Sequence, residues 1–62
     1  MTLQELIRTE RINKGLTKTE LARKSGVSIQ TLVRIEKGYK PNIMTLYNVL
    51  TALGIDIEKI DF

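Results

Sequence analysis

The stretch from Leu16 to Gly38, LTKTELARKSGVSIQTLVRIEKG, decides the fold of this 62-residue chain. It contains two short helical patterns that meet at Gly26, with the small residue Ala22 four positions earlier. A longer side chain at position 22 would strike the next helix where the two cross steeply, and a glycine at position 26 permits a left-handed turn. The stretch therefore predicts a helix-turn-helix unit, with which DNA-binding proteins insert a helix into the major groove.

Apolar residues recur every three or four positions along the rest of the chain, which predicts helices rather than strands. Residues that commonly cap helix N-termini precede four such patterns: Thr2, Thr17, Ser28 and Asn42. Glu5 and Glu20 follow two of these caps at the spacing of a capping box. Glycines end the same four patterns at positions 15, 26, 38 and 54. The residues expected to face the core are Leu21, Ala22, Val27, Leu32, Ile35, Leu46, Val49, Leu50 and Leu53.

The last residues, 55–62, are expected to add one short helical turn, so the predicted fold is all-α. We expect a compact five-helix, repressor-like DNA-binding domain that occupies residues 1–62. The alternation in Ile55-Asp56-Ile57 also fits a strand, although such a strand would need a partner from a second subunit.

The composition argues against an enzyme. Cysteine and histidine are both absent, which excludes disulfides and the usual zinc ligand sets. The chain has no glycine-rich phosphate loop, and a core this small leaves no room for a catalytic cleft. We expect no cofactor. No apolar run approaches the roughly 20 residues of a membrane span, and a cysteine-free chain without a signal segment suits the cytoplasm.

The charge is distributed unevenly. Residues 1–40 carry a net charge of +5 and residues 41–62 a net charge of −2, within an overall charge of +3. A basic body with an acidic tail suits a polyanion partner on one face of the protein. Chance segregation in so small a chain is the alternative.

The helix expected from Ile29 to Lys37 has a mixed outward face. Ile29, Gln30, Val33, Arg34 and Lys37 form one continuous stripe on it. In a major groove, glutamine can bond to adenine, arginine to guanine or phosphate, and isoleucine can pack on a thymine methyl. In the alternative interpretation, Ile29 and Val33 pack against a neighbouring element. The residues expected to read bases are Ser28, Ile29, Gln30 and Arg34.

Phosphate-binding side chains are expected at both ends of this helix, together with the hydroxyl of Thr31 near its start. Lys18 begins the preceding helix, where its charge adds to the free backbone N–H groups. A solvated surface charge is the alternative for each lysine. The residues expected to bind phosphate are Lys18, Thr31, Lys37, Tyr39 and Lys40.

Read together, GLTKTELARKSGVSIQTLVRIEKG (15–38), the following KP and TL pairs and ALGI (52–55) resemble the Cro/C1-type (XRE-like) helix-turn-helix family of phage repressors and bacterial transcriptional regulators. The resemblance implies a partly buried ion pair between Arg11 and Glu36, beside the structural roles of Ala22 and Gly26. Two positions depart from the family: Lys18 replaces a frequent glutamine, and Ile29 replaces a frequent polar base reader. No operator sequence can therefore be transferred.

The sequence thus predicts a sequence-specific double-stranded DNA-binding protein, in the role of a transcriptional repressor. The resemblance also implies a homodimer on an inverted-repeat operator, for which Ile55, Ile57, Ile60 and Phe62 are the candidate contact residues. Those residues could instead complete the core. The alternative function is an antitoxin-like or controller module whose main role is to bind a partner protein.

Overall fold

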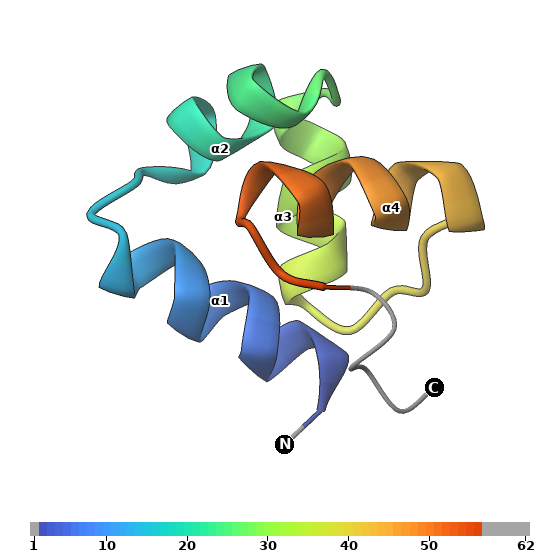
Figure 1. Ribbon diagram of the computed structural model, residues 1–62. Helices are drawn as coiled ribbons and strands as arrows, with labels where there is room; N and C mark the ends of the chain where they lie inside the picture. The colour runs from blue at the N-terminus through green and yellow to red at the C-terminus, as the bar shows by residue number, and fades with distance from the viewer. Residues whose placement is uncertain (1, 57–62) are drawn as a thin grey trace.

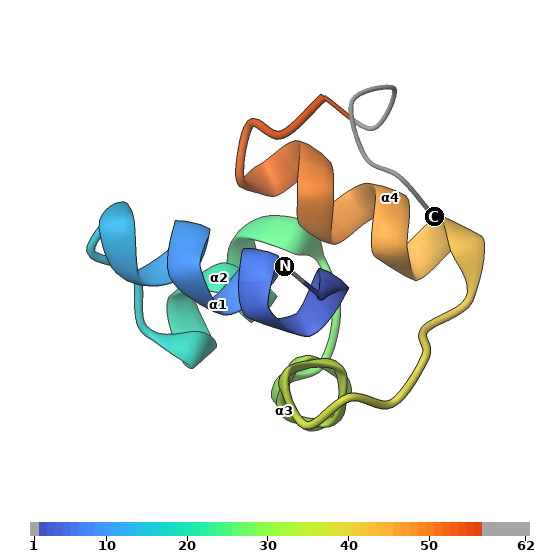
Figure 2. The same cartoon turned by 90° about the horizontal axis from the view of Figure 1, so that it is seen from below.

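The computed structural model describes residues 2–56, and within them it contains four α-helices and no strand. The helices are α1 (Leu3–Asn13), α2 (Lys18–Ser25), α3 (Ile29–Glu36) and α4 (Ile43–Ala52). α2 packs against both α3 and α4, and α1 packs against α3 (Figure 1). Viewed from below, α3 is seen end-on at one side of the molecule, with α4 at the opposite side and α1 between them (Figure 2).

The expected count of five helices is not supported. α4 ends at Ala52 with Leu53 as its C-cap, Gly54 follows with a φ of +73°, and the Ile55 N–H donates to the Leu50 carbonyl at 2.9 Å. This closure is the one by which a left-handed glycine ends a helix. Ile55 then packs against the core outside any helix. The remainder of the expected turn, residues 57–62, lies outside the described residues.

Each of the four helices begins at a side-chain oxygen that accepts the backbone N–H three residues later. The accepting residues are Thr2, Thr17, Ser28 and Asn42, as the sequence predicted. The capping box of α2 is complete: the Thr17 hydroxyl accepts from the Glu20 N–H at 3.1 Å, and the Glu20 carboxylate accepts from the Thr17 N–H at 2.9 Å. These bonds satisfy backbone donors that a helix end otherwise leaves free.

The turn between α2 and α3 depends on Gly26, whose φ is +73°. The Val27 N–H donates to the Ala22 carbonyl at 3.0 Å, so the chain leaves α2 in a tight closure. Ser28 then caps α3 immediately. Ala22 is only 3% exposed. The turn therefore holds α3 against α2 at a fixed angle, which makes α2 and α3 a helix-turn-helix.

All four helices contribute to one hydrophobic core. The residues buried in it are Ile7, Leu21, Ala22, Leu32, Ile35, Leu46, Val49, Leu50 and Leu53. All of the residues expected to face the core are buried, except that Val27 is half-buried and packs against the core from its edge. The core thus uses one side of α3 and leaves its other side to solvent.

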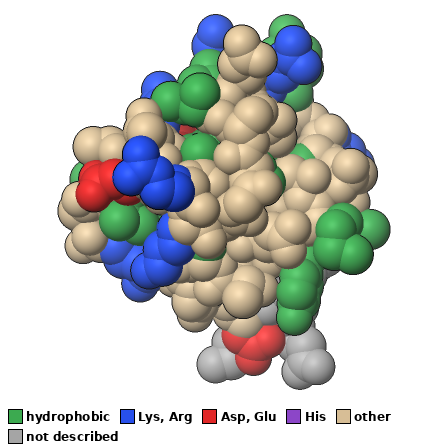
Figure 3. All heavy atoms as spheres, turned by 90° about the horizontal axis from the view of Figure 1, so that it is seen from above, with side chains coloured by type: hydrophobic (Ala, Val, Ile, Leu, Met, Phe, Trp, Pro, Cys, Tyr) green, Lys and Arg blue, Asp and Glu red, His purple; other side chains and the backbone are tan. Residues whose placement is uncertain are grey.

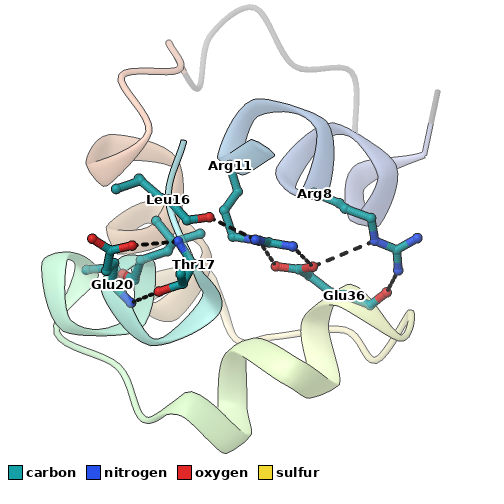
Figure 4. Close-up of polar contacts among 8 residues, drawn as sticks. Arg8, Arg11, Leu16, Thr17, Glu20 and Glu36 are labelled. Carbon is teal, nitrogen blue, oxygen red and sulfur yellow. Dashed lines mark hydrogen bonds and ion pairs between the residues drawn. The ribbon is translucent and has the colours of Figure 1, made fainter. Parts of the chain in front are cut away.

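Glu36, the last residue of α3, is the one buried charged residue within residues 2–56, and its side chain is 2% exposed. Arg11 of α1 donates to both oxygens of its carboxylate, from Nε to Oε2 at 2.9 Å and from Nη2 to Oε1 at 3.2 Å (Figure 4). The third nitrogen of the Arg11 guanidinium donates to the Leu16 carbonyl at 2.9 Å. One arginine therefore links α1, the α1–α2 loop and the end of α3.

A second arginine at this cluster was not anticipated from the sequence. Arg8 donates from Nη2 to the backbone carbonyl of Glu36 at 2.7 Å, and its Nε lies 3.7 Å from the Glu36 carboxylate. Arg8 precedes Arg11 by three positions, so the two share one face of α1. That spacing was the available signal. Arg8 is half-exposed, whereas Arg11 is 12% exposed.

We expect Arg11→Met to lower the free energy of unfolding by about 3–5 kcal/mol, because it leaves the buried Glu36 carboxylate without its bidentate partner. The double variant Arg11→Met/Glu36→Leu should recover much of this loss, since no buried charge remains. Arg8→Met is the matched control and should cost under about 1 kcal/mol because the side chain is half-exposed. Urea denaturation would measure all three, and equal losses in the two single variants would contradict this account.

The capping box of α2 also predicts a pH dependence. The hydrogen bond from the Thr17 backbone, together with the Thr17 hydroxyl, lowers the pKa of Glu20 from its ordinary value of 4.5. A carboxyl group with a lowered pKa in the folded state stabilises the fold above its unfolded pKa, and this contribution is lost as the pH falls through the folded value. Stability should therefore decrease below about pH 4.5 in part through Glu20.

Glu20→Gln retains the hydrogen-bond acceptor but cannot titrate, so its melting temperature should fall less steeply than that of the wild type as the pH is lowered. The control Glu10→Gln removes a carboxylate from the interior of α1 and leaves both caps intact. Thermal unfolding followed by circular dichroism at several pH values would compare them. If the acid limb of Glu20→Gln coincided with that of the wild type, the proposed contribution of Glu20 would be wrong.

Candidate nucleic-acid interface

The two sides of α3 differ sharply in exposure. Leu32 and Ile35 face the core and are 0% and 3% exposed, respectively. Ile29 is 43% exposed, and Gln30 and Arg34 are also exposed. Since the inward residues belong to the common core and α3 packs against α1 and α2, the outward ones are held on a rigid support. An amide, a guanidinium and a branched apolar group are thus presented together on one helix.

Val33 differs from the other residues of the expected outward stripe. It is half-buried, whereas Ile29, Gln30, Arg34 and Lys37 are exposed. Val33 therefore lies at the boundary between the core side and the outward side of α3. Ile29 remains the apolar residue that the packing of this helix does not account for.

Ser28 and Thr31 form a hydroxyl pair at the start of α3. The Ser28 oxygen accepts from the Thr31 N–H at 3.1 Å, and the two hydroxyl oxygens lie 2.8 Å apart. One hydroxyl proton is used between the two oxygens. The other proton remains available to an acceptor outside the protein, such as a phosphate oxygen or a base edge.

Several of the expected phosphate-binding residues meet beside the second half of α3. Thr31, Tyr39 and Lys40, together with the expected base reader Arg34, line one open depression of about 510 Å³ between the end of α3 and the start of α4. Tyr39 is 66% exposed. Lys37, the C-cap of α3, is exposed but does not line this depression, and Lys18 lies at the first position of α2.

The exposed charge of this face is positive. The one acidic residue of α3 is Glu36, which is buried and paired with arginines of α1. None of Arg34, Lys37 and Lys40 forms an ion pair with another residue of the described range. An anionic partner would therefore meet cations that no carboxylate neutralises, on a helix whose one acidic side chain is buried.

The described residues offer no sign of a metal site or a membrane span. Residues 2–56 contain no group of three or more acidic, histidine or cysteine side chains that could hold a metal ion. No helix in the same range is both long and apolar enough to cross a bilayer. Lys24 and Lys14 line a separate open depression between the ends of α2 and α4, away from the outward side of α3.

Comparison with known proteins gives a family match over almost the whole chain. A helix-turn-helix family model matches residues 7–60. An uncharacterized HTH-type transcriptional regulator of Methanothermobacter thermautotrophicus is 42% identical over 53 residues, which cover 84% of this chain and 77% of that protein. Proteins of the same description from Methanocaldococcus jannaschii and Archaeoglobus fulgidus are 43% and 38% identical, over 74% and 87% of this chain and 71% and 79% of their own lengths.

The difference in exposure between the two sides of α3 predicts that substitutions on its outward side affect stability less than substitutions on its core side. Ile29→Ala should change the free energy of unfolding by less than about 1 kcal/mol, because much of the side chain already contacts water. Leu32→Ala, in the core of the same helix, should cost about 2–5 kcal/mol. Thermal or urea denaturation would measure both. A large loss in Ile29→Ala would show that Ile29 serves the fold rather than a ligand.

Proposed function

Because the chain belongs to the XRE-type helix-turn-helix family, we propose that it binds double-stranded DNA sequence-specifically and regulates transcription, with α3 in the major groove. The observation that carries this proposal is the outward side of α3, where Ile29, Gln30 and Arg34 are exposed and no acidic residue of the helix is exposed beside them. A solvated helix would gain nothing from an exposed isoleucine beside these two groups. A DNA groove uses all three.

The base-reading roles follow from the chemistry of each side chain. Gln30 can bond bidentately to N6 and N7 of adenine, and Arg34 to O6 and N7 of guanine. Ile29 has no polar atom in its side chain, so it favours a base pair that presents the thymine methyl. Ser28 adds a hydroxyl at the helix start, where recognition helices contact base edges.

Phosphate contacts on both sides of α3 would orient it in the groove. At one side, Lys18 adds its charge to the N-terminus of α2, whose first N–H groups have no partner within the helix. At the other side, Lys37, Tyr39 and Lys40 follow α3 directly. Thr31 completes this set of phosphate contacts. These contacts carry affinity but no sequence information.

We further propose that the protein acts as a repressor and binds as a homodimer to an inverted repeat. Two copies related by a two-fold axis would place their α3 helices in successive major grooves, about 34 Å apart. Of the residues expected to join the copies, Ile55 packs against its own core. Ile57, Ile60 and Phe62 lie outside the described residues.

Selection of bound duplexes from a random DNA pool would test this function directly. On the selected site, Arg34→Ala should lower affinity by about 10- to 100-fold and relax the preference at one base pair. Lys37→Ala should weaken binding to all sequences alike and reduce the slope of log affinity against log salt by about 1. Arg23→Ala, an exposed cation of α2 without a proposed contact, is the matched control. Failure to bind any duplex at about 50 mM salt would refute the proposal.

A further inference from the structure

Residues 37–41, which we call the α3–α4 segment, carry several of the phosphate contacts of the proposed function but form few hydrogen bonds. The N–H groups of Gly38 and Tyr39 close the end of α3, each with a bond of 3.0 Å to a carbonyl of that helix. Beyond them, Lys40 and Pro41 form no hydrogen bond with another residue of the range 2–56. The next bond is the Asn42 cap of α4. Packing must therefore hold this segment in place.

The first turn of α1 supplies that packing. Gln4 is half-buried and lies against Gly38: a Cβ atom at position 38 would overlap with Oε1 of Gln4 and would lie 3.4 Å from its Cδ. Gly38 has a φ of +104° and no side chain, so the amide of Gln4 approaches the backbone directly. Both residues line one open depression of about 250 Å³ with Tyr39 and Lys40, where the segment passes beside the start of α1 (Figure 1).

Gln4 shares one face of α1 with the two arginines that hold the end of α3. Gln4, Arg8 and Arg11 are spaced by four and three residues, so they follow one another along the helix. Both arginines bind Glu36, the last residue of α3. Gln4 contacts Gly38, two positions further along the chain. This face of α1 thus supports the chain from the end of α3 into the α3–α4 segment.

We propose that Gln4 is a positioning residue for DNA-backbone binding. It holds the α3–α4 segment so that Tyr39 and Lys40 meet phosphates, and it acts through them without a contact of its own to DNA. A segment that is already ordered loses less conformational freedom on binding, so the support raises affinity. Because phosphate contacts carry no sequence information, the support affects all duplexes alike. The inference rests on the proposed function for these phosphate contacts.

Amide hydrogen exchange followed by NMR tests the support in the absence of DNA. Gln4→Ala places a good helix former at position 4 and leaves the Thr2 cap of α1 intact, so the fold should persist. Exchange of the Tyr39 N–H, which bonds to the Arg34 carbonyl, should become at least about fivefold faster. Exchange of the Val27 N–H, in the turn between α2 and α3, should not change.

Two further variants separate the contact from a general effect on α1. Gln4→Met restores a side chain of similar length, so it should recover most of the protection of the Tyr39 N–H. Thr9→Ala is the matched control, because Thr9 is an exposed residue of the same helix outside the depression. It should exchange as the wild type does.

DNA binding tests whether the support acts through the segment. On the selected duplex, Gln4→Ala should lower affinity by about 3- to 10-fold, reduce the slope of log affinity against log salt by up to about 1, and leave the base preference unchanged. Gln4→Met should restore most of the affinity. Lys and Arg side chains project from several parts of the face in Figure 3, so weaker binding alone would not show which contacts were lost.

Double variants identify the lost contacts. Added to Tyr39→Phe/Lys40→Ala, Gln4→Ala should lower affinity by less than about twofold, because the contacts that it supports are already absent. Added to Lys18→Ala, on α2, it should have its full effect.

The inference is overturned if Gln4→Ala exchanges and binds as the wild type does, if its effect is the same in every background, or if Gln4→Met binds no better than Gln4→Ala. Failure of the wild type to bind any duplex would refute the proposed function instead. In that case the exchange of the Tyr39 N–H still decides whether Gln4 holds the segment, so the two failures are distinguishable.

Discussion

The position of α3 depends on a single buried carboxylate. Glu36 stands at the C-terminal end of this helix, almost without contact to water, and both of its oxygens accept from Arg11. A charge in that place is tolerated only while its partner is present. The same guanidinium also holds the Leu16 carbonyl, and Arg8 binds the backbone carbonyl of Glu36. The end of α3 is thereby tied to α1 and to the loop that leads into α2.

The opposite end of α3 is held by the turn at Gly26 and the cap at Ser28. Both ends of an eight-residue helix are thus secured by specific interactions, while Leu32 and Ile35 attach its middle to the core. A short helix has little stability of its own, so almost all of its order comes from these contacts. Because these contacts fix the backbone of α3, they also fix where its outward side chains begin. Ile29, Gln30 and Arg34 are therefore held in place without any hydrogen bond or ion pair from their side chains to another residue of the described range.

Much of this arrangement could be predicted because it is local. Thr17 with Glu20 encodes a helix start, and Gly26 encodes a left-handed turn, within a few residues of chain. The contacts that the sequence did not reveal are long-range. Arg8 meets Glu36 across 28 positions, and its place three positions before Arg11 on α1 was the one sign of this contact in the sequence. The division between Ile29, which is exposed, and Val33, which is half-buried, likewise depends on how neighbouring helices cover α3. The five-helix count is not supported by the described residues, since after Gly54 the glycine closure of α4 directs Ile55 back onto the core outside any helix.

Ser28 links the stability of the protein to how its target could change during evolution. Its hydroxyl caps α3 and lies at the start of the helix that we propose to face DNA. Substitutions there are confined to the few residue types that can cap a helix, because losing the cap costs about 1 kcal/mol in a small domain with little stability to spare. Ile29 and Gln30 do not cap a helix, so this constraint does not apply to them. New binding preferences should therefore arise first at these two positions, while Ser28 drifts only among serine, threonine, aspartate and asparagine.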